Sequence, residues 1–212
     1  MDGMDFFDVV GTQRAMRRLK PDPIPPTVIR RILDAAICAP SGGNRQGWSF
    51  IIVQDASLRG KIGALYRESF MLLLEHAPAY KAATTAPLGS PDRKMIDSAL
   101  YLADHMAAAP VLLLACIGTD GARPGLTSGA SIYPAVQNIL LAARALGIGS
   151  TLTTVHHRFR HDEIRSLLGV PNDVEVAALI PLGYPRGSFG RPPRRPVTEV
   201  AFSDRWGARF EG

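Results

Sequence analysis

Apolar residues recur along the chain in two patterns, one with the periodicity of amphipathic helices and one typical of buried strands. Helical spacing predicts a helix that begins near Pro26 and ends before residues 40–44, with an apolar face of Val28, Ile29, Ile32, Leu33 and Ala36. Further helices are predicted over residues 4–10, 57–76, 93–108, 131–146 and 162–168. Short runs of β-branched and aromatic residues predict strands over 48–53, 111–116, 150–154 and 175–182. Strands separated by helices predict a mixed α/β sandwich.

Other segments show neither of these patterns. Residues 21–26 contain four prolines and are expected to form a stiff extended connector. Residues 77–92 contain three prolines and a glycine, which predicts a long loop. The tail after Gly183 is rich in Pro, Arg and Gly, too irregular to fold alone, and is expected to wrap a partner. The predicted helix over 131–146 has few polar positions, so we expect the core or a second subunit to cover both its sides.

The chain has 212 residues, which suits one domain, and a formal net charge of +5. Its arginines cluster over residues 14–18, 30–31 and 186–195. The sequence has no RNA-recognition signature, no zinc-finger spacing and no long basic helix. A solvated surface with one local anion site is therefore favoured over a nucleic-acid-binding module.

We expect a cytoplasmic protein with no membrane segment. Residues 1–10 contain three aspartates and no basic start, unlike a signal peptide, and the apolar runs are far shorter than the roughly 20 residues that span a bilayer. Cys38 and Cys116 lie far apart among apolar neighbours and are expected to be buried thiols in a reducing compartment.

Several common sites are absent from the sequence. There is no Gly-x-Gly-x-x-Gly, no phosphate-binding Gly-x-x-x-x-Gly-Lys-Ser/Thr and no Gly-x-Ser-x-Gly. His156, His157 and His161 are close in sequence, but a surface cluster near a helix start is favoured over metal ligands. The sequence therefore predicts neither a metal site nor a catalytic His or Cys.

Two arginine-rich segments could hold an anion, because guanidinium groups pair two-pronged with phosphate. Arg14 and Arg17 follow the first predicted helix, and residues 191–196 (Arg-Pro-Pro-Arg-Arg-Pro) lie near the C-terminus. The second segment could complete a phosphate site begun by the first. Taken alone, a solvated basic patch and an exposed tail explain these segments about equally well.

Residues 39–48 have the composition of a ligand-binding loop. Two glycines allow close backbone approach, while Ser41, Asn44 and Gln46 offer neutral donors and acceptors. The edge of a flavin ring, with its alternating carbonyl and N–H groups, needs such partners. A loop that only ends the preceding helix would explain the glycines, but not the density of amide side chains.

These segments, in this order, resemble the FMN-dependent nitroreductase family. The most specific match is Pro-Ser-Gly-Gly-Asn-Arg-Gln followed by Trp within residues 39–48. It is supported by Arg-Ala-Met-Arg-Arg at 14–18, by Gly-Ile-Gly-Ser-Thr-Leu-Thr-Thr at 147–154 and by Leu-Gly-Tyr-Pro at 182–185. The sequence departs from the family pattern at Gln13, where many members carry another arginine, and at Gly47, which replaces a proline.

The resemblance implies an α+β fold in which helices wrap a mixed β-sheet. It implies one FMN-binding domain over residues 1–212, with a C-terminal extension from about residue 184. It also implies an intertwined homodimer with FMN sites at the interface, where the helix over 131–146 would pack.

Carried over by position, the implied FMN contacts are Arg14, Ala15, Arg17, Ser41, Gly43, Asn44, Gln46, Leu152, Thr153, Thr154, and Arg194 or Arg195. Arg14 and Arg17 would meet the phosphate and the ribityl or pyrimidine side, and Ser41 would reach across from the other subunit. Thr153 and Thr154 would lie against the ring through backbone groups. Arg17 is the cation expected near N1 and O2 of the flavin, where reduction builds negative charge.

The implied activity is ping-pong hydride transfer from NADH or NADPH to a small organic acceptor such as a nitroaromatic or a quinone. The flavin carries this chemistry, so no catalytic side chain is required. The alternatives are a specialised member of the same fold (a reductive dehalogenase, an enoyl-type reductase or a flavin-fragmenting enzyme) and a flavin-binding protein with little turnover.

Overall fold

The computed structural model describes residues 4–119 and 125–210, and the start of the aspartate-rich segment, residues 1–3, lies outside them. The helices are α1 (Phe6–Thr12), α2 (Pro26–Ala36), α3 (Ala56–His76), α4 (Pro78–Thr84), α5 (Pro91–His105), α6 (Leu126–Ala145), α7 (His156–Phe159) and α8 (His161–Leu167). The strands are β1 (Trp48–Val53), β2 (Val111–Gly118), β3 (Gly149–Ser150) and β4 (Val174–Gly183), and single 3₁₀ turns occur at Gly42–Asn44, Met106–Ala108 and Val197–Glu199.

The four strands form one antiparallel sheet in the order β1-β2-β4-β3. A bulge between Ala115 and Cys116 shifts the register of β2 against β4. A parallel bridge joins Ala15 to Ser150, so the segment after α1 lies along the β3 edge of the sheet. The predicted α+β class is therefore confirmed, with a sheet whose named strands all pair antiparallel.

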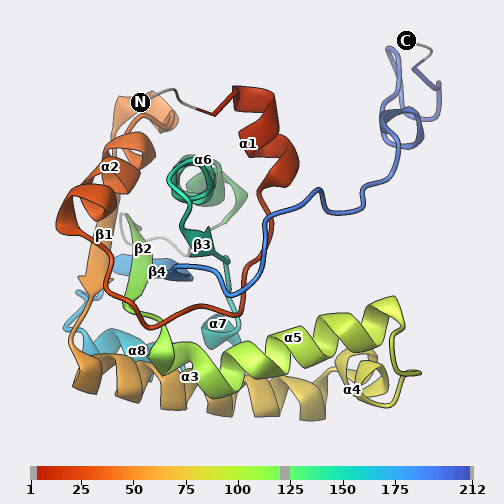
Figure 1. The fold of residues 1–212 in the computed structure, drawn as a ribbon. Helices are drawn as coiled ribbons and strands as arrows, with labels where there is room; N and C mark the ends of the chain where they lie inside the picture. Colours follow the sequence, from red (N-terminus) through yellow and green to blue (C-terminus); the bar gives the residue numbers. More distant parts are fainter. Residues whose placement is uncertain (1–3, 120–124, 211–212) are drawn as a thin grey trace.

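Helices cover both faces of the sheet (Figure 1). The central strand β2 is buried from Val111 to Ile117, and its side chains alternate between two cores. Leu112 and Leu114 belong to the core formed with α3 and α5, whereas Leu113 and Ala115 belong to the core formed with α2 and α6. This arrangement explains why the sequence of β2 is apolar throughout.

Helix α6 begins five residues before the start predicted from the sequence and contains Pro134. Its inner side is buried through residues such as Ile132 and Ile139. On other sides, Leu126 is 96% exposed and Tyr133 is 42% exposed. Within the single chain, therefore, the sheet and α2 cover one side of α6 and part of the helix stays open, so that cover by a second subunit stays a prediction.

The predicted loop over residues 77–92 is wrong in its first half, which forms α4. Pro78 occupies the first turn of α4 and Pro91 the first turn of α5, positions where the missing N–H costs nothing. These two prolines mark helix starts. The predicted strand over 150–154 is also shorter than expected, because β3 ends at Ser150 and Thr153 makes only an isolated bridge to Leu179.

The expectation of two buried thiols is right for Cys116 and wrong for Cys38. Cys38 follows the end of α2, where its thiol donates to the carbonyl of Asp34 at 3.2 Å and stays exposed. Cys116 lies in β2, and burial raises the pKa of its thiol to about 11. The apolar neighbours of Cys38 in sequence thus do not enclose it in the fold.

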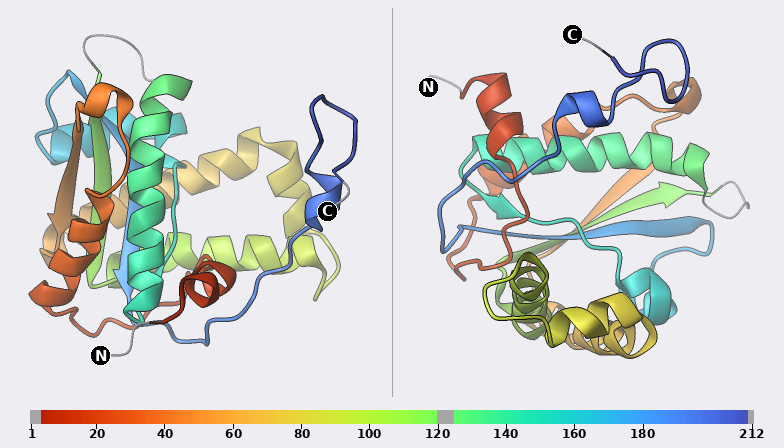
Figure 2. Two further views of the ribbon diagram at one scale, coloured as in Figure 1. Left: turned by 90° about the horizontal axis from the view of Figure 1, so that it is seen from above. Right: turned by 90° about the vertical axis from the view of Figure 1, so that its right-hand side faces the viewer.

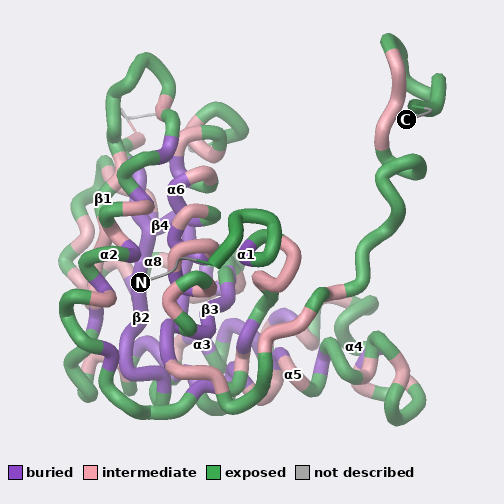
Figure 3. The backbone as a smooth tube through the Cα atoms, turned by 45° about the horizontal axis from the view of Figure 1, so that its top comes forward, coloured by how far each residue is buried: buried purple, intermediate pink, exposed green. Residues whose placement is uncertain are grey.

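The C-terminal segment leaves the body of the molecule after β4 (Figure 3). It is first anchored beside the chain after α1, because Lys20 N donates to Tyr184 O at 2.7 Å and Arg186 N to Arg18 O at 2.9 Å. Farther along, Phe210 N donates to Ala201 O within the segment itself, and Trp206 is 89% exposed. No helix among the residues that the structure describes is long and apolar enough to cross a membrane.

Candidate functional site

The segment after α1 is held at the edge of the sheet by backbone contacts. Met16 N donates to Ser150 O at 2.9 Å, next to the bridge between Ala15 and Ser150. Gly149 makes this approach possible, because a Cβ there would lie 2.9 Å from Leu19 Cδ2 and 3.1 Å from Met16 Cβ. The same segment presents Arg14 to solvent and leaves Arg17 partly buried.

Arg17 faces the segment that follows β3. Together they line a cavity of about 200 Å³, whose walls include Tyr66, Tyr80, Leu152, Thr153 and Thr154. Burial lowers the pKa of Arg17, and the neighbouring Tyr66 and Tyr80 partly offset this effect. A guanidinium remains charged under such conditions, so the cavity contains a partly desolvated cation. The structure thus brings four of the predicted residues together here.

Thr153 is fixed in this wall by two kinds of contact. Its backbone N–H and C=O both pair with Leu179 at 3.0 Å, and its hydroxyl lies 3.2 Å from the hydroxyl of Tyr66. Burial raises the pKa of Tyr66, with the Thr153 and Arg17 contacts acting in the opposite direction. The backbone N–H and C=O of Thr153 are therefore both paired with Leu179, and the expected position of Thr153 against a flavin ring stays a prediction.

The loop before β1 forms a tight turn with a strained backbone and lines a cavity. Ser41 Oγ accepts from Gln46 N at 3.0 Å, and Gln46 Nε2 donates to Asn44 Oδ1 at 3.2 Å. Gly43, Asn44 and Gln46 all have left-handed backbone conformations, with φ of 59°, 53° and 50°. Such conformations are costly for residues other than glycine and often occur at binding sites. The loop lines a second cavity of about 540 Å³ together with Ser128 and Ser131 of α6.

These two parts of the predicted site lie toward opposite ends of α6 (Figure 2). The amide-bearing loop reaches the first half of the helix, where Gly42 N donates to Ser131 Oγ at 3.2 Å. The end of α1, directly before the arginine segment, reaches the last turn of α6, where Arg144 Nε donates to Thr12 Oγ1 at 2.9 Å. Ser131 and Arg144 are thirteen positions apart on the helix, which corresponds to a rise of about 20 Å. The single chain therefore does not bring Ser41, Gly43, Asn44 and Gln46 to Arg14, Ala15 and Arg17.

Arg194 and Arg195 lie exposed in the C-terminal segment, and Arg194 Nη1 donates to the carbonyl of its neighbour Pro193 at 2.9 Å. A different arginine approaches α1. Arg191 Nη2 lies 3.7 Å from Asp8 Oδ1, and its guanidinium packs against Gly11. Arg191 belongs to the arginine-rich segment singled out from the sequence, whereas Tyr66 and Tyr80 line the Arg17 cavity and were not predicted. The two tyrosines come from α3 and α4, which carry no motif.

The histidine group is only in part the surface cluster that the sequence predicted, because His157 is an exposed residue and the other two are not. His156 is fully buried, the side chain of His161 is 17% exposed, and that of His157 is 30% exposed. Glu175 of β4 supplies a carboxylate to the group, at 2.9 Å from His161 Nε2 and 3.2 Å from His157 Nδ1. Burial lowers the pKa of His156 to about 3 and also lowers the pKa of His157. The carboxylate of the group belongs to Glu175, which follows His161 by 14 residues. The closeness of the histidines in sequence could therefore not reveal this partner.

Comparison with known proteins links this geometry to a family. The family model described as the nitroreductase family matches residues 10–184. A protein of Methanothermobacter thermautotrophicus, whose name assigns it provisionally as an NADH dehydrogenase/NAD(P)H nitroreductase, is 31% identical over 190 residues, which cover 88% of this chain and 81% of that protein. The iodotyrosine deiodinase of Thermotoga neapolitana is 28% identical over 194 residues, covering 91% of this chain and 95% of the relative.

One solved structure is similar over nearly the whole chain. The crystal structure of oxidized iodotyrosine deiodinase bound to FMN and 3-iodo-L-tyrosine has a TM-score of 0.72 and 25% sequence identity. The similarity covers 95% of this chain and 98% of that one.

Proposed function

Because this chain belongs to the nitroreductase family of oxidoreductases, we propose that it is an FMN-dependent enzyme. It takes hydride from NADH or NADPH and reduces a small organic acceptor such as a nitroaromatic or a quinone. The observation that carries this proposal is the pair of complementary half-sites, one cationic around Arg17 and one rich in neutral hydrogen-bonding groups around Ser41.

The cationic half-site fits an anionic, aromatic group. Arg17 is partly buried, and the described residues give it two tyrosines as neighbours but no carboxylate in an ion pair. A buried charge without a counterion is costly, so an anionic ligand would compensate it. Arg14 lies exposed on the same segment, where it could meet a phosphate.

The second half-site would come from another copy of the chain. The loop of Ser41, Asn44 and Gln46 lies about 20 Å along α6 from the arginine segment. One isoalloxazine ring is too short to contact residues at both places. A two-fold axis across α6 would place the loop of one copy beside the arginines of the other. The exposed Leu126 and Tyr133 of α6 and the extended C-terminal segment support such a homodimer. In it, Arg194 or Arg195 would complete the phosphate contacts.

When bound, FMN would supply the hydride chemistry, and the chain would bind, orient and shield it. Arg17 would hold a positive charge beside the negative charge that reduction creates. Tyr66 stays protonated, because burial raises its pKa, and it holds Thr153 in the cavity wall. Apolar side chains such as Phe70 and Leu102 limit the access of water to the same cavity. Donor and acceptor would occupy one pocket in turn.

The visible spectrum of the purified protein tests this proposal. We expect a yellow protein that carries one FMN per chain and loses its absorbance within seconds when NADH or NADPH is added without oxygen. Quinone or nitroaromatic addition should then restore the oxidised spectrum. A colourless monomer that takes up no FMN from an excess would contradict the proposal.

Reductive dehalogenation of an iodinated phenol is a second candidate function. It is favoured by the two similar proteins that carry the name iodotyrosine deiodinase, at 28% and 25% identity over more than nine-tenths of this chain. In that reaction a C–I bond is replaced by a C–H bond, two electrons come from the reduced cofactor, a proton comes from solvent, and iodide leaves. Iodide and tyrosine released from 3-iodo-L-tyrosine by the reduced protein would identify this activity, and their absence would exclude it.

A further inference from the structure

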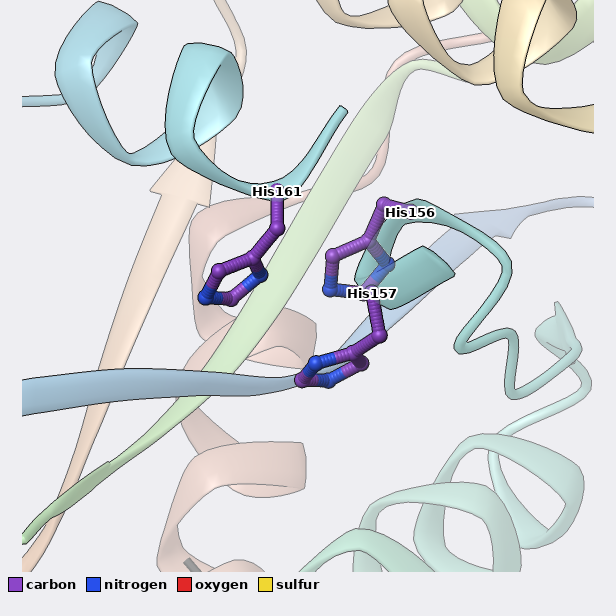
Figure 4. Close-up of side chains that lie close together, drawn as sticks. All are labelled: His156, His157 and His161. Carbon is purple, nitrogen blue, oxygen red and sulfur yellow. The ribbon is translucent and has the colours of Figure 1, made fainter. Parts of the chain in front are cut away.

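Three histidines that the proposed flavin chemistry does not use meet where α7 and α8 lie beside β4 (Figure 4), and Glu175 of β4 lies next to two of them. His156, His157 and His161 each offer a ring nitrogen, and these nitrogens lie within 4.8 Å of one another. The ring centroids of His156 and His157 are 4.5 Å apart, and those of His157 and His161 are 4.8 Å apart. Oε1 of Glu175 lies beside the two rings of His157 and His161, as described above.

The backbone of β4 fixes the tautomers of two of these rings. Nε2 of His156 lies 3.2 Å from the carbonyl oxygen of Val176, and Nε2 of His157 lies 3.2 Å from that of Ala177. A carbonyl can only accept, so each Nε2 carries the proton, and in the neutral ring the lone pair is on Nδ1. Carbonyl and carboxylate groups likewise hold one ring nitrogen of ligating histidines at metal sites.

Among the described residues, the other nitrogens of these rings are not satisfied by regular hydrogen bonds. Nδ1 of His156 is buried, and no hydrogen-bond partner for it is found among the described residues. Nδ1 of His157 faces Glu175 Oε1 at 3.2 Å, so that a lone pair meets a carboxylate oxygen unless a positive charge lies between them. His161 Nε2 lies 2.9 Å from the same oxygen without the alignment of a hydrogen bond. A cation in this space would satisfy all three rings and the carboxylate.

We propose that His156, His157, His161 and Glu175 form a binding site for a divalent transition-metal ion of the Zn²⁺ type. Three neutral imidazoles and one carboxylate are a common tetrahedral ligand set for Zn²⁺. Bonds of about 2.0–2.1 Å hold ligand nitrogens roughly 3.4 Å apart. The ring nitrogens lie up to 4.8 Å apart, so the rings have to turn toward one another when the ion binds.

The ion can reach the site from a cavity of about 480 Å³ that His157 and Glu175 help to line. Thr154 lines this cavity and also the cavity of Arg17. A bound ion would therefore tie α7 and α8 to β4 directly behind the wall of the proposed flavin pocket, without being a part of it. The metal site does not depend on the proposed function, since its ligands are outside the predicted FMN contacts.

Calorimetric titration with ZnCl₂ tests the site on the full chain, purified without a polyhistidine tag, stripped with EDTA and carrying Cys38→Ser to remove the exposed thiol. We expect one Zn²⁺ per chain with a dissociation constant of about 1 µM or tighter. The double substitution His157→Gln/His161→Gln should weaken binding more than about 100-fold, and Glu175→Gln about 10- to 100-fold. Metal analysis after equilibrium dialysis gives the stoichiometry independently.

The chain contains five histidines, which provides a matched control. His76→Gln/His105→Gln removes the two histidines outside the cluster, both exposed, and should bind Zn²⁺ as the parent does. Circular dichroism checks that each variant is folded, and the single substitution of the partly exposed His157 replaces the double one if needed. The proposal is overturned if the parent binds no stoichiometric Zn²⁺, or if the cluster variants bind it as tightly as the parent.

Discussion

The hydroxyl oxygens of Tyr66 and Thr153 lie 3.2 Å apart in the interior and join α3 to the segment that follows β3. This contact forms the inner wall of the cavity that Arg17 enters. It positions a segment that has little regular structure of its own, because β3 ends three residues earlier. The hydrogen bond should therefore matter both for stability and for the shape of the pocket.

A double-mutant cycle measures this contact. Tyr66→Phe and Thr153→Val each remove one hydroxyl, and each should lower the free energy of unfolding by about 1 kcal/mol. The double variant should lose less than the sum of the two, with a coupling of about 1 kcal/mol, measured by urea unfolding. Strictly additive losses would show that the two hydroxyls do not interact.

Arg17→Ala should weaken FMN binding at least about tenfold, which corresponds to 1.4 kcal/mol. It should also lower the midpoint potential of the flavin that remains bound, because a cation near the ring stabilises its reduced state. Arg67→Ala is the control, since Arg67 forms an exposed ion pair with Asp104 away from the cavity. An unchanged potential in flavin-saturated Arg17→Ala protein would remove this residue from the proposed role.

Mixing two defective variants tests whether each site uses two chains. Arg17→Ala disables one half-site, and Asn44→Gly disables the other while preserving the left-handed backbone at that position. Random assortment gives half mixed dimers, each with one intact and one doubly defective site, so about a quarter of all sites should bind FMN normally. Flavin content after unfolding and refolding the mixture measures this fraction. A site made by one chain would recover none.

Gly149→Ala should lower the free energy of unfolding by about 1–3 kcal/mol, because the new Cβ overlaps Leu19 and Met16. Gly187→Ala serves as the control, since nothing lies within 4 Å of the added atom and its backbone is not left-handed. Its effect should stay below about 1 kcal/mol. Urea unfolding compares the two variants directly, and equal effects would show that the segment after α1 can shift to make room.

The two cysteines should differ in reactivity. A thiol reagent at pH 8 should modify Cys38 quickly and Cys116 only after unfolding, so one of the two thiols per chain reacts in the native protein. The raised pKa of Cys116 makes the folded state bind more protons than the unfolded state between about pH 9 and 11. Stability should therefore fall by about 1 kcal/mol between pH 8 and 10, and Cys116→Ala should show less of this loss.

Much of the fold follows from apolar periodicity. The strands β1, β2 and β4 and the helices α2, α3 and α5 were predicted within a few residues, because each buries a long apolar face. Two short helices, α4 and α7, were missed. α7 has four residues and is held by contacts with α3, so local sequence carries little information about it.

The candidate site was predicted only where its residues are sequence neighbours. The Ser41 loop and the Arg17 segment were recognised from their residues and from the family resemblance, but their separation along α6 depends on tertiary packing. Glu175 joins His157 and His161 through a strand that follows them by 14 or more residues. Tyr66 and Tyr80 point into the Arg17 cavity from helices without any motif, so no local pattern marks them.

The complete burial of β2 has a consequence for handling the protein. Residues 111–117 contain no charge and no proline, and both faces of the strand depend on helices for cover. A partly unfolded chain that releases α3 or α6 would expose a segment with the composition of an amyloid-forming strand. Heating should thus end in irreversible aggregation, whereas urea, which keeps the released chain in solution, should allow refolding.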